Sequence, residues 1–306
     1  MSQPLISLCI PTNGVIEWVF PVLDSIYSQN VDNELFEVVV TDNGNNAEFF
    51  TLMSEYALKH NNLKYQKNNA YMFDNQLEAL KLADGKYLKF VNHSAVFTDG
   101  SLNHLIKIIK ENILEKPVIY FSCGALKKDI YKLSNFDDFV KTLGKLVSWT
   151  TGVGIWKEDY DKIPKNVKYD KISPHSGILF SERQKNKYIV DNYPFSKEIR
   201  TNHANKGSYD LFKAFAVEEV AIALNLYIDN SIKAKTFKSV KKDYRKFVSD
   251  LYKNFCILKS PCSYNLKGFD DAMGIFFSKK QIVMEAYLFL CKSVLGKIKR
   301  VLLRRK

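Results

Sequence analysis

The first 120 or so residues alternate between two hydrophobic spacings, and this alternation leaves few folds open to the chain. Short apolar runs at residues 5–10, 35–40, 63–66, 86–91 and 118–122 have the length and composition of buried strands. Between them, residues 17–29, 46–60, 72–83 and 100–112 repeat apolar side chains about every 3.6 residues, which predicts amphipathic helices. Strands alternating with helices predict a mostly parallel sheet flanked by helices, a Rossmann-like α/β fold.

Polar residues follow each of these predicted strands, at residues 11–14, 41–44, 66–70 and 92–94. Ligands bind at the carboxyl ends of parallel strands, so these positions are the first candidates for a site. A carboxylate there can accept hydrogen bonds from a base N–H or a ribose hydroxyl, which singles out Asp42. The alternative is a plain turn, because Asp-Asn-Gly is a favoured turn sequence.

The rest of the chain has weaker patterns. From residue 134 to 171 the periodicity fades, and helical spacing returns at 207–226, 238–258 and 268–306, with a break near 278–280. We therefore expect a domain of residues 1–205, with a nucleotide-binding half of about 1–122 and an acceptor half of about 123–205. Residues 206–306 should form a helical C-terminal region.

The net charge indicates which kinds of partner the chain can bind, and the cysteines indicate in which cellular compartment it works. The net charge of +12 favours anionic partners, but much of the excess lies after residue 233, which argues against a nucleic-acid-binding protein. The five cysteines form no Cys-x-x-Cys pair, which argues against a zinc site and favours reduced thiols in the cytoplasm. No signal peptide and no apolar stretch long enough to span a membrane are found.

Several segments resemble the bacterial family-2 glycosyltransferases, which have the GT-A fold. Residues 6–14 resemble the opening strand and its Pro-Thr turn, residues 23–29 the helix "L-x-S-I-x-x-Q", and residues 36–44 the second strand and acidic turn. Residues 68–75, 83–88 and 100–102 resemble the later "N-x-G-x-x-x-N", "A-x-G-x-Y-I" and "G-x-L" motifs. The order and spacing of these pieces over residues 4–110 carry the resemblance.

The resemblance implies transfer of a sugar from a nucleotide-diphosphate sugar to a saccharide or lipid-linked acceptor, in surface polysaccharide synthesis. It also implies that the first and second strand-end turns hold the nucleotide. The candidate donor-site residues are Pro11, Thr12, Asn13, Asp42, Asn75, Asn92 and His93. The alternative is a catalytically impaired protein of the same fold that binds nucleotide or glycan without turnover.

The chain departs from the family after the fourth strand, where an Asp-x-Asp or Asp-Asp normally binds a divalent cation. Here Asn92-His93-Ser94 offers no carboxylate, and these side chains are poor ligands for Mg²⁺ or Mn²⁺, so no metal ligand is assigned. Three explanations stay open. Catalysis is metal-independent, Asp99 supplies the carboxylate, or transfer activity is lost. In a metal-independent mechanism, a positively charged side chain would neutralise the diphosphate. His93, His175 and Arg183 are the candidates.

An inverting transferase also needs a general base for the acceptor hydroxyl. By resemblance, residues 149–156 form the acceptor loop, where Trp149 or Trp156 could stack on a sugar, although core packing explains them equally well. Asp170 and then His175 are the candidates for the base.

The last 22 residues predict a basic amphipathic helix. Apolar residues share one helical face, and Lys and Arg occupy much of the rest; the apolar set is Tyr287, Leu290, Val294, Leu295, Ile298, Val301 and Leu302. Such a helix can lie on an anionic membrane, which predicts a cytoplasmic protein bound peripherally to the inner face of the cell membrane. The alternative is a terminal helix packed on the core.

Overall fold

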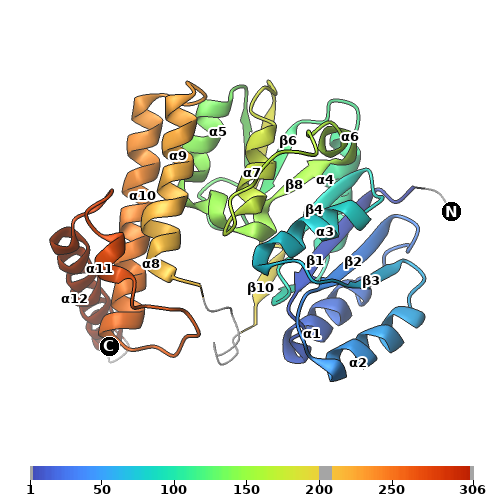
Figure 1. Cartoon of the computed structure of the whole chain (residues 1–306), viewed down its shortest axis with the longest axis horizontal. Helices are drawn as coiled ribbons and strands as arrows, with labels where there is room; N and C mark the ends of the chain where they lie inside the picture. The colour runs from blue at the N-terminus through green and yellow to red at the C-terminus, as the bar shows by residue number, and fades with distance from the viewer. Residues whose placement is uncertain (1–2, 200–208, 304–306) are drawn as a thin grey trace. The chain divides into compact units, whose positions relative to one another are not determined.

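A computed structural model of the chain describes residues 3–199 and 209–303, the side chains of 296–303 excepted. The chain divides into two compact units, Met1–Arg200 and Thr201–Lys306. Figure 1 colours the first from blue to yellow and the second from yellow to red. The boundary expected near residue 205 lies outside the described residues.

The first unit is built on a five-stranded sheet with the order β3-β2-β1-β4-β8 (Figure 1). Four strands are parallel, and the edge strand β8 (Gly154–Trp156) is antiparallel to β4. The parallel strands are β1 (Ile6–Thr12), β2 (Phe36–Asp42), β3 (Leu63–Lys67) and β4 (Tyr87–Phe90). The predicted mostly parallel sheet is confirmed. Because β1 lies between β2 and β4, the strand order reverses there, at the point where such sheets bind ligands.

Helices cover both faces of this sheet, which explains why β1 and β2 are buried along almost their whole length. Leu8 and Ile10 of β1 belong to the core cluster that includes α1 and α4, whereas the Cys9 thiol contacts the carbonyl of Ala79 on α3. The helices are α1 (Ile16–Tyr27), α2 (Ala47–Leu58), α3 (Asn75–Leu82, after the 3₁₀ turn Met72–Asp74) and α4 (Ser101–Asn112).

The weakly periodic middle of the chain folds into short elements. A three-stranded sheet has the order β6-β9-β7, and β5 pairs with β10 in a two-stranded ribbon. These strands are β5 (Ala95–Phe97), β6 (Val118–Phe121), β7 (Ile130–Leu133), β9 (Tyr188–Asp191) and β10 (Ser196–Glu198). The other elements are α5 (Phe136–Leu143), the 3₁₀ turns Gly144–Ser148 and Thr150–Gly152, α6 (Lys157–Asp161) and α7 (Pro174–Ser181).

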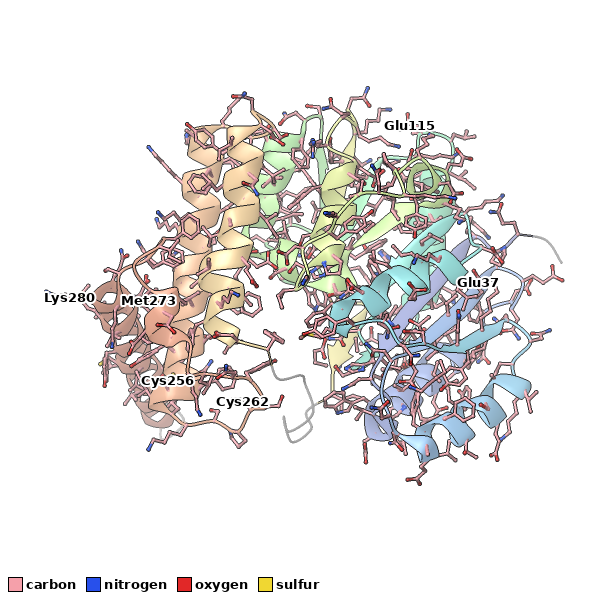
Figure 2. The ribbon with its side chains drawn as sticks, viewed as in Figure 1. Glu37, Glu115, Cys256, Cys262, Met273 and Lys280 are labelled. Atoms are coloured by element: carbon pink, nitrogen blue, oxygen red, sulfur yellow. The ribbon has the colours of Figure 1, made fainter. Side chains whose placement is uncertain are left out.

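A buried carboxylate fixes the amino ends of the strands. Glu37 accepts hydrogen bonds from the Ser7 hydroxyl (2.6 Å) and from the N–H groups of Asp84 (2.6 Å) and Gly85 (3.1 Å) (Figure 2). Its second oxygen lies 2.8 Å from the Lys64 ammonium. This network holds the edge of the sheet opposite to the strand ends that bind ligands.

The second unit is mainly helical, as predicted, with an isolated β-bridge between Asp210 and Asn265. The helices are α8 (Leu211–Lys213), α9 (Glu219–Ile228), α10 (Ala234–Tyr252), α11 (Phe269–Ala272) and α12 (Lys279–Leu303), with π-helical turns at Ala214–Glu218 and Lys253–Ile257. The hydroxyl of Tyr244 donates to Glu219 (2.9 Å) and joins α10 to α9. Within the described ranges, no helix is both long enough and apolar enough to cross a membrane.

Candidate functional site at the strand ends

Asn75, the first residue of α3, holds the carboxyl ends of β1 and β2 together. Its amide nitrogen donates to the carbonyls of Thr12 (3.0 Å) and Thr41 (2.8 Å), and its amide oxygen accepts from Asn68 (2.8 Å). The side chain is buried, so its hydrogen-bonding capacity is used inside the protein. Asn75 therefore shapes this edge of the sheet in the structure and does not face an incoming ligand.

Asp42 is also fully buried at the end of β2. One carboxylate oxygen accepts from the N–H of Gly44 (2.8 Å), and the other accepts from the Tyr65 hydroxyl (3.3 Å) and lies 3.8 Å from the Lys67 ammonium. The carboxylate thus does not point into open solvent. It stabilises the following turn by accepting the hydrogen bond from Gly44. A direct bond from Asp42 to a nucleotide stays a prediction, and it needs this turn to open.

The turns after β1 and β2 lie directly against each other. A Cβ atom on Gly44 would come within 1.9 Å of the Asn13 carbonyl oxygen, so only glycine fits there. The N–H of Asn43 donates to the Thr12 carbonyl (3.1 Å), which adds a second link between the turns. Asn13 is exposed and Pro11 half-buried, so the two turns present one polar surface to solvent.

His93 occupies the switch point between β1 and β4. Its Nδ1 lies 2.9 Å from the Thr12 hydroxyl, which also accepts from the N–H of Gly14 (3.1 Å). The Trp18 indole packs edge-on against the imidazole with ring centroids 4.9 Å apart. The structure thereby brings the predicted residues Thr12 and His93 into contact and fixes the orientation of the imidazole.

Glu198 of β10, which the sequence did not single out, lies against the segment that follows β4. Its carboxylate accepts from the Asn92 amide (3.3 Å) and the Ser94 hydroxyl (2.7 Å), and the N–H of Ile199 donates to the Ser94 carbonyl (2.8 Å). The bonded side chains are 106 and 104 residues apart, so no local pattern could reveal the pairing. The segment after β4 has no carboxylate of its own, but Glu198 of β10 places one against it.

These residues do not fit the family's cation site. Apart from Glu198, the side chains at this position are an amide, an imidazole and a hydroxyl, which hard divalent cations disfavour. In the part of the chain that the structure describes, no group of three or more His, Cys, Asp and Glu side chains could hold a metal ion. Asp99, the other candidate carboxylate, is exposed in the turn before α4.

A buried lysine links β4 to the loop before β8. The Lys89 ammonium donates to the Thr151 carbonyl (2.5 Å) and lies over the rings of Phe121 (4.3 Å) and Phe195 (4.5 Å). The Thr151 hydroxyl in turn accepts from the N–H of Asn92 (2.9 Å). Burial away from water lowers the pKa of Lys89 to about 7. Lys89 therefore connects the strand-end site to the 3₁₀ turn Thr150–Gly152, which lies within the predicted acceptor loop.

The two candidate acceptor tryptophans have different environments. Trp149 is half-buried and packs near Phe195 with ring centroids 6.4 Å apart. Trp156 is 1% exposed, donates its indole N–H to the Pro117 carbonyl (2.8 Å) and packs edge-on against Tyr87. Trp156 is thus a core residue in this structure and has no free ring face for a sugar.

The two candidate bases lie at the start of α7. Asp170 is half-buried, and one of its oxygens accepts from the N–H groups of Ile172 (2.8 Å) and Ser173 (3.0 Å). The Nδ1 of His175 lies 3.2 Å from the Gln76 amide oxygen, and burial lowers the pKa of His175 to about 4. Its Nε2 is buried without a hydrogen-bond partner. The imidazole is therefore neutral near pH 7 and cannot balance phosphate charge as it stands.

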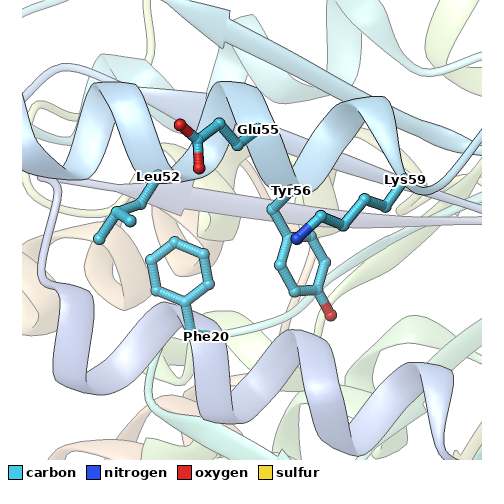
Figure 3. Close-up of a pocket in the computed structure, with 5 residues that line it drawn as sticks. All are labelled: Phe20, Leu52, Glu55, Tyr56 and Lys59. Atoms are coloured by element: carbon cyan, nitrogen blue, oxygen red, sulfur yellow. The ribbon is translucent and has the colours of Figure 1, made fainter.

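Two other features lie away from the strand ends. Arg183, a candidate for neutralising the diphosphate, is exposed just after α7. A hollow on the outer side of α1 and α2 has none of the candidate residues; Figure 3 shows its lining of Phe20, Leu52, Glu55, Tyr56 and Lys59. It is separate from the site described above.

The fold is similar to those of two solved nucleotide-sugar complexes. S. aureus TarS 1-349 in complex with UDP-GlcNAc has 16% sequence identity and a TM-score of 0.60, with 89% of this chain and 80% of that chain covered. The mannosyltransferase PcManGT from Pyrobaculum calidifontis, in complex with GDP-Man and Mn²⁺, has 14% identity and a TM-score of 0.53, with coverage of 80% and 72%. At these identities the likeness shows the fold alone.

Sequence comparison gives the family. No curated protein sequence matches the chain. The model of "Glycosyl transferase family 2" matches residues 7–172, which is more than half of the chain and contains the strand-end turns after β1, β2 and β4 and Lys89. The chain belongs to glycosyltransferase family 2, whose members transfer sugars from nucleotide sugars.

Proposed function

We propose that this chain transfers a sugar from a nucleotide-diphosphate sugar to a saccharide or lipid-linked acceptor in surface polysaccharide synthesis. The observation that carries the proposal is the polar surface formed by the contacting turns after β1 and β2, held by Asn75 within a family-2 domain. Residues 1–205 would carry the reaction, with donor binding in about 1–122 and acceptor binding in 123–205. The nucleotide sugars bound by the two similar structures support this class of donor.

In this proposal the donor lies across Pro11, Thr12 and Asn13, and the diphosphate faces His93. The acceptor hydroxyl attacks the anomeric carbon, and the bond to the diphosphate breaks with its electron pair on the leaving oxygen. The half-buried carboxylate of Asp170 takes the hydroxyl proton, with His175 as the second choice. A hydrogen bond or positive charge from His93 stabilises the leaving group without a metal. Trp149 offers its exposed part to the acceptor.

The test is nucleoside diphosphate release from a panel of nucleotide sugars, with Mn²⁺ and with a chelator. We expect release from one donor class to persist in chelator, and His93→Ala to slow it by about 10²-fold, the size of effect seen when one such stabilising group is removed. Activity that needs Mn²⁺ would contradict the metal-independent mechanism. Absence of both binding and release across the panel would contradict the proposed function.

The second candidate function is binding without turnover. It is favoured by the missing acidic motif at Asn92-His93-Ser94 and by the complete burial of Asp42. A donor that raises the melting temperature of the chain but is not cleaved, with any acceptor, would support this candidate over the transferase.

Replacing Glu198 should affect donor use more than stability. Glu198→Ala removes the partner of Asn92 and Ser94, so we expect a several-fold rise in the KM for the donor. Because the side chain is exposed, the free energy of unfolding should change by no more than about 0.5 kcal/mol. The matched control is Glu115→Ala, which removes an exposed carboxylate paired with Lys187 (Figure 2). Equal KM values for both variants would show that Glu198 does not position the donor segment.

We also propose that the protein works at the inner face of the cell membrane, where a lipid-linked acceptor would be found. The free state of the five cysteines is compatible with a reducing compartment. The basic amphipathic helix at the end of the chain, residues 285–306, would provide the contact with lipid.

A further inference from the structure

The helix α12 has two apolar faces in different environments. Toward the unit's interior, Ile282 and Ala286 are fully buried, and Glu285 forms an ion pair with Arg245 of α10 (3.1 Å). The opposite side leaves large apolar side chains in water: Met284 (57% exposed), Tyr287 (52%), Leu288 (53%), Val294 (47%) and Leu295 (64%). Of the apolar set predicted from the sequence, Tyr287, Val294 and Leu295 are exposed, whereas the side chains of Ile298, Val301 and Leu302 lie outside the described ones.

The exposed residues form one continuous stripe. Met284, Leu288, Cys291 and Leu295 follow one another at intervals of four, three and four residues, so they share a helical face. Tyr287 and Val294 lie beside this stripe and are seven residues apart, which is about two turns of the helix. A contiguous apolar surface of this kind on a folded unit marks a place where a partner binds.

Charge indicates what the partner is. Residues 279–306 contain nine Lys or Arg residues and one acidic residue, Glu285, whose charge is already balanced by Arg245. Lys280, at the amino end of α12 (Figure 2), and Lys292 are exposed. A second copy docked through this face would bring like charges together, which is unfavourable. An anionic lipid surface complements them instead.

We propose that α12 lies in the headgroup region of an anionic membrane, with Met284, Leu288 and Leu295 inserted among the acyl chains and Lys280 and Lys292 at lipid phosphates. A helix with one apolar face and a charged opposite side lies parallel to a membrane surface. The inference extends the proposed function by naming the surface at which a lipid-linked acceptor would be met.

Cys291 allows a direct test, because it is an exposed thiol within the stripe. Cys9 is buried, and the other three thiols are removed as Cys123→Ser, Cys256→Ser and Cys262→Ser. The full chain is labelled at Cys291 with an environment-sensitive fluorophore and mixed with vesicles of phosphatidylcholine and phosphatidylglycerol. We expect a blue-shifted emission, which weakens at high salt and is absent with phosphatidylcholine alone. Vesicle binding with an unshifted label would overturn the proposal.

Two substitutions test the inserted face. Leu288→Asp and Leu295→Asp should each weaken vesicle binding by at least about tenfold, since each replaces an inserted leucine with a charge that anionic lipid repels. Leu114→Asp, at a 93% exposed leucine of the first unit, is the matched control and should bind like the wild type. Loss of a dimer, with unchanged vesicle binding, would assign the face to a second copy and reject the lipid. Donor-dependent nucleotide release without vesicles should be unchanged in all three variants, so failure of lipid binding is distinguishable from failure of the transferase.

Discussion

Replacing Asn75 with leucine is expected to lower the free energy of unfolding by about 2–4 kcal/mol and to abolish most donor binding. The substitution removes one donor to the Thr41 carbonyl and one donor to the Thr12 carbonyl, which also accepts from the Asn43 N–H. It also leaves the Asn68 amide without the oxygen it bonds. Without this clamp the two turns that form the proposed donor surface lose their fixed separation.

The measurement is urea unfolding together with donor binding at a temperature where the variant stays folded. Asn62→Leu is the control, because its amide also donates to a strand carbonyl, that of Phe36 (3.0 Å), but at the amino end of β2. We expect the control to lose some stability and to keep its donor affinity. Wild-type donor affinity in folded Asn75→Leu would place the donor elsewhere.

Lys89→Met should be more stable than the wild type near pH 6, by about 1–3 kcal/mol, with the difference shrinking as the pH rises. The ordinary pKa of lysine is 10.5, and burial lowers that of Lys89 to about 7. Between these values the unfolded chain binds more protons than the folded one, so the wild type gains stability with rising pH. Methionine has no proton to lose, and this contribution disappears. The negative charge of Asp191 opposes the shift but does not cancel it.

The same variant should transfer sugar more slowly despite its higher stability. Methionine cannot donate to the Thr151 carbonyl, so the loop of residues 150–152 loses its tie to β4, and with it the acceptor for the Asn92 N–H. Denaturation and nucleotide release are followed from about pH 6 to pH 10, with the exposed Lys187→Met as the control. Parallel stability curves for wild type and Lys89→Met would show that Lys89 does not titrate in this window.

Long, strongly patterned segments were predictable from the sequence because burial imposes their period. The runs that became β1, β2, α1 and α4 were expected within about two residues of their observed ends. Strands β5 and β10 have three residues each, too few to show a period. Lys89 was hidden for another reason. A lysine in a strand suggests a solvent-facing side, whereas this one is covered by aromatic rings.

The place of the site was also predictable, because the carboxyl ends of parallel strands meet at one edge of a sheet. Residues 11–14, 41–44, 66–70 and 92–94 were expected there for this reason. The direction of each side chain was not predictable. Asp42 and Asn75 turn toward backbone groups of the protein, and Trp156 enters the core. Glu198 depends on the pairing of β10 with β5, a contact between distant parts of the chain.

Consecutive residues of α3 reach two different parts of the first unit. Asn75 donates hydrogen bonds to the carbonyls at the ends of β1 and β2, and the amide oxygen of Gln76 contacts the imidazole of His175 on α7. The first turn of α3 thus connects the ends of β1 and β2, where the donor is proposed to bind, to α7 in the segment proposed to receive the acceptor. A displacement of these turns by a bound nucleotide would act on α7 through α3, so we expect the two substrates to influence each other's affinity.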